Sequence, residues 1–333
     1  MIILSKYIRE KTRSQNKRKK RRLRRWVKLT LTIILLLVVA VIVYAHSIYN
    51  HAKSTVNDEM NIVLDSIDQS KTRTKIENKE ILNVLLLGVD ERAEVDGSRS
   101  DTIIVVSLDP KNEKLRMVSI PRDTRVTISG EGTKDRINAA YSYGGADMAI
   151  ETVEDFLNID LDYYVEMNMQ GLADLVDAIG GITVNNEIEW YDEGFYKKGY
   201  HFKKGEIELD GAKTIGYVRM RHLDPKGDFG RTERQRKVIK AIIDKGTSFA
   251  TVAKMNDLID VVGDNMQTNM KFKDMKALLA NYINVTNNIE SYMIQGKDDW
   301  INGIYYYAVS DQEIIKVHNM VKGKSVEEEV TDK

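Results

Sequence analysis

Residues 102–120 read TIIVVSLDPKNEKLRMVSI, two apolar runs separated by a short polar turn. Runs rich in β-branched residues on either side of a turn are typical of strands, so we predict strands at 102–109 and 114–120. Because the connection PKNE is short, these strands should be antiparallel neighbours. A further run, VLLLGVD at 84–90, predicts a buried strand that precedes them.

Helical and extended patterns alternate over the rest of the chain. We predict helices at 145–157 and 170–179, from Thr232 onward, and around 252–262 and 273–285. Further strands are predicted at ITVNN (182–186), KTIGYVRMRH (213–222) and 304–309. This alternation predicts an α/β fold, an α-β-α sandwich around a central mixed sheet.

The charges of the chain are divided unevenly. The whole chain has 50 basic and 50 acidic residues, but residues 1–28 hold thirteen Lys or Arg and only Glu10. That leaves 37 basic and 49 acidic residues elsewhere, a net charge of −12 against +12 in the first segment. Such a division is typical of a basic tail or of a chain that crosses a compartment boundary.

An uncharged segment follows the basic residues, with no Asp, Glu, Lys or Arg from Leu29 to Ala52. About 20 apolar residues in a helix span the hydrocarbon core of a bilayer, so we predict a transmembrane helix at 29–50. The positive-inside rule then places the basic tail 1–28 in the cytoplasm and the rest of the chain outside the cell. A cleaved signal peptide and a nucleic-acid patch are weaker alternatives, because the apolar run is long and the basic run adjoins it. Residues 1–28 have no helix-turn-helix pattern, and we predict no nucleic-acid partner.

The exported part is predicted to contain three regions. Residues 51–80 are charged, with apolar residues at approximate helical spacing, which favours a short helical stalk. Residues 81–323 form the extracellular domain, and 324–333 form a disordered tail.

Charged residues lie where the first three predicted strands end or begin. Asp90 closes the first strand, Arg99 and Asp101 open the second, and Arg122 follows the third. If the first two strands run in opposite directions, these side chains meet at one end of the sheet. Loops at strand ends are where open α/β sheets bind ligands.

A second group of arginines lies in YVRMRHLDPKGDFGRTERQR (217–236). On the predicted strand, Arg219 and Arg221 would share a face. Arg231 and Gln235 are four residues apart on the predicted helix and would also share a face. Asp228 would cap that helix or orient an arginine.

The arginines and aspartates together suggest chemistry at a phosphate. A guanidinium group binds phosphate oxygens in pairs and keeps its charge at every relevant pH. Carboxylates among arginines make sense if Mg²⁺ (or Mn²⁺) bridges them to the phosphate, so Asp90 and Asp101 are candidate metal ligands. Surface ion pairs are the alternative explanation for such a charged stretch. The chain has no GxSxG, HExxH or Walker motif.

Seven motifs, in order, closely resemble the LytR–CpsA–Psr family. They are GVDER (88–92), SRSDTIIVVSLDP (98–110), VSIPRDTRV (118–126), INAAYSYGG (137–145), LVDAIGGITV (175–184), ELDGAKTIGYVRMRH (208–222) and DFGRTERQR (228–236). The resemblance covers a core at about residues 82–245 and leaves 246–323 as a C-terminal helical extension.

The resemblance implies a membrane-anchored cell-wall enzyme of Gram-positive bacteria. Its expected reaction moves an anionic glycopolymer, such as wall teichoic acid or a capsule-like polymer, from undecaprenyl pyrophosphate to a muramic acid hydroxyl of peptidoglycan. Alternatives are a regulatory protein that holds a polyprenyl phosphate and a polyprenyl pyrophosphatase.

The resemblance also implies roles for individual residues. Asp101, Arg122, Arg219 and Asp228 are the expected catalytic residues, and Asp90 and Asp101 match the ligands of Mg²⁺. The pyrophosphate would be bound by Arg99, Arg122, Arg219, Arg221, Arg231 and Gln235. The polyprenyl tail needs an apolar groove. Val165, Leu172, Leu175 and Ile179 are candidates to line it, and we assign them to the ordinary core.

Overall fold

The computed structural model describes residues 32, 34, 36–40, 43–44, 46–90, 99–246, 263 and 265–324. The chain forms two units, Met1–Ala52 and Lys53–Lys333. The described residues of the first unit are helical, and within the described part of the chain no helix is both long and apolar enough to cross a membrane. Residues 1–31 and several residues between 33 and 45 lie outside that part. The spanning helix at 29–50 therefore stays a prediction.

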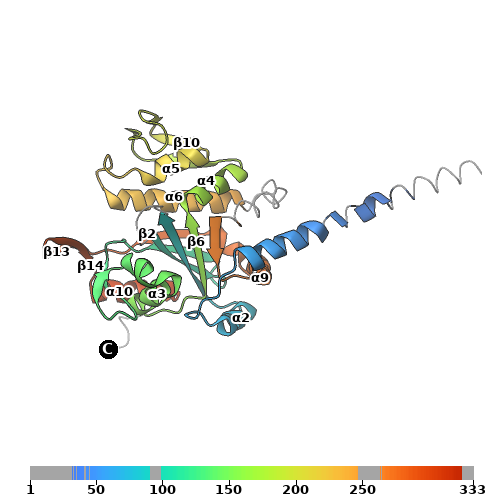
Figure 1. The fold of residues 1–333 in the computed structure, drawn as a ribbon, viewed down its shortest axis with the longest axis horizontal. Coiled ribbons are helices and arrows are strands. Elements are labelled where there is room, and N and C mark those ends of the chain that lie inside the picture. Colours follow the sequence, from blue (N-terminus) through green and yellow to red (C-terminus); the bar gives the residue numbers. More distant parts are fainter. Residues whose placement is uncertain are drawn as a thin grey trace, which may run out of the picture. The chain divides into compact units, whose positions relative to one another are not determined.

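The second unit is built on a mixed sheet of six strands in the order β11-β6-β1-β2-β3-β12 (Figure 1). Their bounds are β11 Met266–Thr268, β6 Tyr163–Asn168, β1 Leu82–Asp90, β2 Arg99–Asp109, β3 Lys114–Ser119 and β12 Ile289–Met293. The β1–β2, β2–β3 and β6–β11 pairs are antiparallel, whereas β1–β6 and β3–β12 are parallel. The predicted antiparallel pairing of β2 and β3 is confirmed. β1 also runs antiparallel to β2, which is the condition for the charged strand ends to meet.

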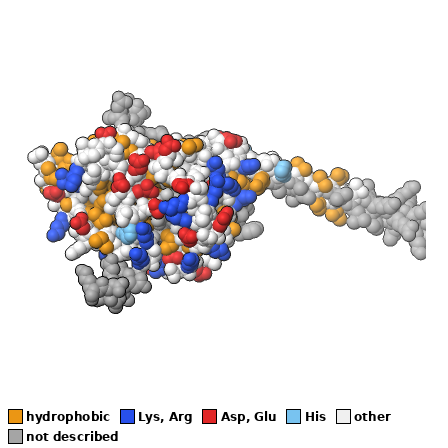
Figure 2. All heavy atoms as spheres, turned by 90° about the horizontal axis from the view of Figure 1, so that it is seen from below, with side chains coloured by type: hydrophobic (Ala, Val, Ile, Leu, Met, Phe, Trp, Pro, Cys, Tyr) orange, Lys and Arg blue, Asp and Glu red, His pale blue; other side chains and the backbone are white. Residues whose placement is uncertain are grey.

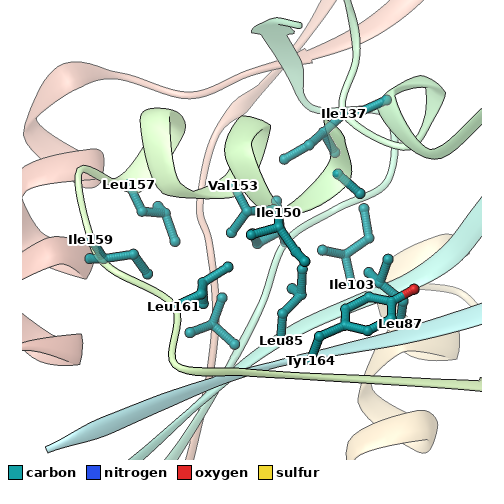
Figure 3. Close-up of a cluster of buried hydrophobic side chains, with 14 of the residues drawn as sticks. Leu85, Leu87, Ile103, Ile137, Ile150, Val153, Leu157, Ile159, Leu161 and Tyr164 are labelled. Atoms are coloured by element: carbon teal, nitrogen blue, oxygen red, sulfur yellow. The ribbon is translucent and has the colours of Figure 1, made fainter. Parts of the chain in front are cut away.

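Helices cover both faces of this sheet, because its central strands are apolar on both sides. Leu85 and Leu87 of β1 pack in one cluster, while Leu82 and Val84 of the same strand pack in another. Figure 3 shows the first cluster under α3 (Ala139–Leu157), to which α10 (Asp311–Val321) also contributes. The opposite side carries α4 (Met169–Ala178), α5 (Gly211–Arg219) and α6 (Asp228–Gly246), which lie together above the sheet in Figure 1.

The remaining elements are short and surround this sandwich. They are the π-helix η1 Thr55–Glu59, α2 Gln69–Glu77, β4 Arg125–Thr127, β5 Lys134–Arg136, β7 Ile182–Asn186, β8 Trp190–Tyr191, β9 His201–Phe202, β10 Gly205–Leu209, α9 Phe272–Tyr282, the 3₁₀-helix η2 Ile283–Asn287, β13 Lys297–Ile301 and β14 Ile304–Ala308. Basic and acidic side chains lie side by side on the face shown in Figure 2. No large field of a single sign therefore covers that face.

Two predicted elements differ from the structure. Residues 213–222 were expected to form a strand, but Gly211–Arg219 are the helix α5, because Asp210 caps its N-terminus by accepting a hydrogen bond from the Lys213 amide. The helical stalk at 51–80 is also interrupted. Its residues 60–68 are not helical, and Asn61 forms a β-bridge with Thr268, so this segment packs against the domain.

The other predicted helices and strands are present with shifted ends. α6 begins at Asp228, several residues before the predicted start. α3 begins at Ala139, but Gly144 and Gly145 have non-helical backbone angles and kink it, so the part after the kink begins where a helix was predicted. The predicted helix around 252–262 lies outside the described residues. The predicted tail 324–333 lies outside them too, apart from Lys324.

Candidate active site

The ends of three strands meet at one edge of the sheet. Asp90, the last residue of β1, lies opposite Arg99, the first residue of β2. β3 ends at Ser119, and Arg122 follows in the next loop. The antiparallel order of these strands therefore gathers the charged residues as the sequence predicts.

A β-bulge sets the position of Asp101. Gly88 pairs with Thr102 and Val89 pairs with Ser100, so Asp101 is the extra residue on β2. Bulges re-aim a side chain at the edge of a sheet and are frequent beside active sites. Glycine is required at position 88, because a Cβ there would lie 2.9 Å from Cβ of Thr102.

Arg122 lies between several carboxylates. Its Nη1 donates a hydrogen bond of 2.7 Å to Oδ1 of Asp101, and its Nε lies 3.6 Å from Asp123 and 3.8 Å from Asp228. Burial alone would lower the pKa of Arg122, but attraction to Asp101 and Asp228 outweighs it and the pKa is raised. The guanidinium group is thus held in a fixed orientation and stays charged.

The first turn of α6 supplies the facing side chains. Arg231 is buried, and its Nη2 lies 2.8 Å from Oδ1 of Asp228, the first residue of the helix. Burial lowers the pKa of Arg231, and so does repulsion from Arg122 and Arg221, while Asp228 opposes the shift. The positive charge of Arg231 is therefore only partly compensated by its neighbours.

Several buried polar atoms around this point have no hydrogen-bond partner among the described residues. They are Nε of Arg122, Oδ1 of Asp228, Nε and Nη2 of Arg231, and Oε1 of Gln235. Arg231 and Asp228 are close enough for an ion pair, but the N–H does not point at the oxygen in hydrogen-bond geometry. Unpaired buried donors are costly, and here they are concentrated on two arginines. This arrangement suits an anion with several oxygens.

Arg219 and Arg221 lie at the end of a helix rather than on a strand. Arg219 is the last residue of α5, and Arg221 lies in the turn after it, with Nη2 3.1 Å from Nε2 of His222. The prediction that Arg219 and Arg221 share one face of a strand is therefore wrong. Arg221 still lies near the cluster, because its charge acts on Arg231.

Arg99 and Asp90 lie at the outer end of the first strand pair. Arg99 is exposed. The hydrogen bond from the Tyr143 hydroxyl to Asp135 raises the pKa of Tyr143, and the positive charge of Arg99 acts in the opposite direction. The side chain of Asp90 is outside the described part of the structure. Among the side chains that are described, no group of three or more His, Cys, Asp or Glu is arranged to hold a metal ion. Asp90 and Asp101 as ligands therefore stay a prediction.

An apolar cavity of about 210 Å³ opens beside the arginines, between the sheet and helices α4 and α6. Its walls include Leu86, Gly88, Val165, Met167, Leu172, Leu175, Val238, Ile239, Ile242 and Ile243. Gln235 also lines it, one helical turn after Arg231. Val165, Leu172 and Leu175 pack against the core, as predicted, and they also line this cavity. Ile179 belongs to the closed core, as predicted.

Sequence reasoning missed the residues that hold this site in place. Arg234 is buried and donates to Asp224, to the carbonyl of Met220 and, at 3.0 Å, to the carbonyl of Tyr217. It thereby fixes the turn that carries Arg219 and Arg221. Arg236 donates a 2.8 Å hydrogen bond to Ser119 and so ties α6 to the end of β3. The alternating arginines of RTERQR were a signal for both residues.

Known proteins match this chain over most of its length. A model of the LytR_cpsA_psr family matches residues 41–323. The polyisoprenyl-teichoic acid–peptidoglycan teichoic acid transferase TagU of Bacillus subtilis (strain 168) is 41% identical over 313 residues, which are 93% of this chain and 98% of TagU. The TagU of Halalkalibacterium halodurans is 41% identical over 286 residues, which are 85% of this chain and 92% of that protein.

Solved structures agree with these matches. Protein gbs0355 of Streptococcus agalactiae has a TM-score of 0.68 at 35% identity, with 75% of this chain and 91% of that chain covered. A structure of TagT bound to LIIa-WTA has a TM-score of 0.62 at 30% identity, with 80% and 96% covered. This chain therefore belongs to the LytR–CpsA–Psr family.

Proposed function

We propose that this chain is a phosphotransferase that moves an anionic, teichoic-acid-like glycopolymer from a polyprenyl pyrophosphate carrier to a muramic acid hydroxyl of peptidoglycan. One observation carries the proposal. The unpaired buried donors of Arg122 and Arg231 lie beside an apolar cavity, and Gln235 lines that cavity. A lipid diphosphate needs both features, a cationic site for its phosphates and a dry channel for its chain. The names of the TagU relatives support the same reaction.

The reaction is a displacement at phosphorus. The acceptor oxygen forms a new P–O bond to the phosphorus that carries the polymer, and the bond from that phosphorus to the bridging oxygen of the lipid phosphate breaks. The products are a phosphodiester and the free lipid phosphate, and the hydroxyl proton passes to a carboxylate of the site. Arg122 and Arg231 stabilise the negative charge that spreads over the phosphate oxygens in the transition state.

Each aspartate of the site has a distinct proposed role. Asp101 holds Arg122 through the 2.7 Å hydrogen bond, which fixes the plane of the guanidinium fork. Asp228 lies between Arg122 and Arg231 and offsets the repulsion between the two cations. Arg219, Arg221 and Arg99 complete the binding of the two phosphates from the rim.

We further propose that Mg²⁺ or Mn²⁺ assists the reaction. The residues fit such an ion, because Mg²⁺ binds through one or two carboxylates together with phosphate oxygens and water. Asp90 and Asp101 would hold the ion, and it would neutralise charge on the diphosphate. The expected result is loss of transfer in EDTA and its recovery with added Mg²⁺ or Mn²⁺. Full activity in EDTA would contradict the assignment.

We propose that the chain is anchored in the cell membrane with its N-terminus in the cytoplasm. The thirteen basic residues of 1–28 and the uncharged stretch 29–52 support this topology. An anchor of this kind keeps the domain within reach of a donor whose lipid lies in the outer leaflet.

The decisive experiment mixes the full-length chain with lipid-linked polymer, peptidoglycan and Mg²⁺. We expect polymer to become covalently attached to peptidoglycan and lipid phosphate to be released in equal amount. Lipid phosphate released without any acceptor would indicate a pyrophosphatase instead, and binding without turnover would indicate a regulatory protein.

Arginine variants link that activity to the site. Arg122→Ala and Arg219→Ala should abolish transfer without unfolding the domain. The matched control is Arg116→Ala, because Arg116 lies near the other end of the sheet, where it pairs with Glu290 on β12. Arg116→Ala should transfer polymer at the wild-type rate.

A further inference from the structure

A hairpin rich in aromatic residues projects from the domain. β13 and β14 pair with Trp300 opposite Tyr305, and Figure 1 shows the hairpin at the left edge of the molecule. Trp300 is 67% exposed and Ile304 at the tip is 49% exposed. The rings of Trp300 and Tyr305 contact each other edge to face, with their centroids 5.5 Å apart. Large exposed apolar groups that lie together mark binding surfaces.

The base of this hairpin is attached to the loop that carries Arg122. The backbone amide of Tyr307 donates a 2.8 Å hydrogen bond to the carbonyl of Asp123. Tyr307 also forms a parallel β-bridge with Thr124. Arg136 adds a further link, because its Nε donates a 3.1 Å hydrogen bond to the carbonyl of Tyr305 and lies 3.3 Å from Asp123. The hairpin is therefore held rigidly against the residue that follows Arg122.

A second attachment joins the hairpin to α6. The ring of Tyr307 packs against Phe229, with centroids 5.3 Å apart, and Phe229 directly follows Asp228. On the hairpin, Trp300 lies two residues beyond Asp298, the partner of Tyr307. Two residues of a strand span about 7 Å, so Trp300 lies within the length of a short oligosaccharide from Tyr307.

We propose that the β13–β14 hairpin binds the glycan strand of the acceptor, with pyranose rings stacked on Trp300 and Tyr305. This inference rests on the proposed function, since it assigns the acceptor to a surface beside the same site. The C–H groups on one face of a pyranose carry partial positive charge, and the face of an aromatic ring is negative. Asp298 lies on the same face of β13 as Trp300, and its Oδ1 accepts a 2.8 Å hydrogen bond from the Tyr305 hydroxyl. The carboxylate of Asp298 can also accept hydrogen bonds from sugar hydroxyls.

The charge of the hairpin indicates which of the two substrates, the acceptor glycan or the donor polymer, binds there. The donor polymer is anionic, and the carboxylate of Asp298, on the same face of the hairpin as Trp300, repels anions. The pyrophosphate end of the donor is matched instead by the arginines of the active site. A largely uncharged sugar backbone is the occupant that fits an aromatic surface beside a carboxylate.

The test measures glycan binding without any transfer reaction. The full-length chain is sedimented with insoluble peptidoglycan from which teichoic acid has been removed, and the bound fraction is measured. We expect Trp300→Ala to weaken binding about five- to tenfold, the loss of one favourable aromatic contact. Trp300→Phe keeps an aromatic face and should bind within about twofold of wild type. The control Leu279→Ala removes a side chain that is 61% exposed on α9 and should bind normally.

Kinetics give a second, independent measurement. In the transfer reaction, Trp300→Ala should raise KM for peptidoglycan by the same factor and leave kcat and KM for the lipid donor unchanged. The inference would be overturned if Trp300→Ala bound peptidoglycan as well as the wild type does, or if only KM for the donor changed. Either result would leave the proposed function intact. Loss of binding in Trp300→Ala without any wild-type transfer would support the glycan surface and count against the transferase. An unchanged melting temperature shows that the variants remain folded.

Discussion

Arg122 and Asp101 are joined by a hydrogen bond of 2.7 Å from Nη1 to Oδ1, although 21 residues separate them in the chain. Arg122 follows the end of β3, and Asp101 is the bulged residue of β2. The pair therefore forms only when both strands are in register. Asp101 binds Nη1 of the guanidinium group. Nε has no hydrogen-bond partner among the described residues and lies 3.8 Å from Asp228.

Arg122→Lys should therefore be almost as inactive as Arg122→Ala. A lysine has one compact charge and cannot contact Asp101 and a phosphate in a fixed plane. Loss of such a transition-state contact costs about 10²–10³ in kcat. Single-turnover transfer rates would measure the effect, and a lysine variant within tenfold of wild type would show that charge alone is sufficient.

Arg231 and Arg234 offer a matched comparison on one helix. Both are buried, but within the described part of the chain Nε and Nη2 of Arg231 have no hydrogen-bond partner, whereas Arg234 contacts Asp224 and two backbone carbonyls. Breaking a buried, satisfied ion pair costs about 3–5 kcal/mol. We expect Arg234→Met to lose about 3 kcal/mol of unfolding free energy, and Arg231→Met to lose less than about 1 kcal/mol.

The transfer activities of these two variants should not follow their stabilities. Arg231→Met should abolish transfer in a folded protein, because Arg231 is the cation that its neighbours only partly compensate. Urea titration of both variants checks the stabilities. If both substitutions lower the free energy of unfolding equally, the missing hydrogen bonds of Arg231 do not affect the stability of the fold.

The main strands and the charged strand ends could be predicted because their signals are local. The runs at 84–90, 102–109 and 114–120 are apolar, and the short turn at 110–113 determines the relative direction of the second and third runs. The gathering of Asp90, Arg99 and Arg122 at one edge also needed β1 to run antiparallel to β2, which the structure shows. The bulge at Asp101 could not be predicted, because it depends on how Gly88 and Thr102 pack across two strands.

α5 was mistaken for a strand because its side chains favour one. Thr214, Ile215, Tyr217 and Val218 have high strand propensity, but propensity is a weak signal that tertiary packing overrides. The helix is set by the cap at Asp210 and by burial of Tyr217 and Val218 in the cluster that α4 and α6 share. Asp210-Gly211 was the local signal that pointed to a helix start.

The cavity has no sequence signature, since its walls are made of ordinary core residues. Val165 lines it, whereas Val153 on α3 is fully buried in the closed core. Val165→Phe should therefore fill space and leave the melting temperature nearly unchanged. Val153→Phe has no space to fill and should cost about 1–3 kcal/mol.

The same pair of variants tests the lipid role of the cavity. Val165→Phe should raise KM for a long-chain polyprenyl donor and leave KM for a short-chain donor unchanged. Thermal denaturation and donor kinetics measure the two effects. Equal KM values for the long-chain donor in Val165→Phe and wild type would place the lipid elsewhere.

Asp210 gives a prediction about pH, because it both caps α5 and pairs with a lysine. Its carboxylate accepts a 2.8 Å hydrogen bond from the Lys213 amide and lies 2.8 Å from Lys213 Nζ. Burial alone would raise the pKa of Asp210, but the bonds with Lys213 outweigh it and the pKa is lowered. A lowered pKa in the folded state stabilises the fold above the unfolded pKa of about 3.9, and this contribution is lost as the pH falls through the folded value.

Asp210→Ala should thus cost about 1 kcal/mol at pH 7, the usual effect of losing an N-cap. Asp210→Asn keeps a capping oxygen and loses only an exposed ion pair, so its cost should be a few tenths of a kcal/mol. Between pH 5 and 7 the deficit of Asp210→Ala should be constant, because wild-type Asp210 stays ionised in the folded and the unfolded state. Below pH 4 the deficit should shrink as the wild-type carboxylate gains its proton. Urea unfolding across this range measures it, and a deficit independent of pH down to pH 3 would mean that the charge of Asp210 contributes nothing.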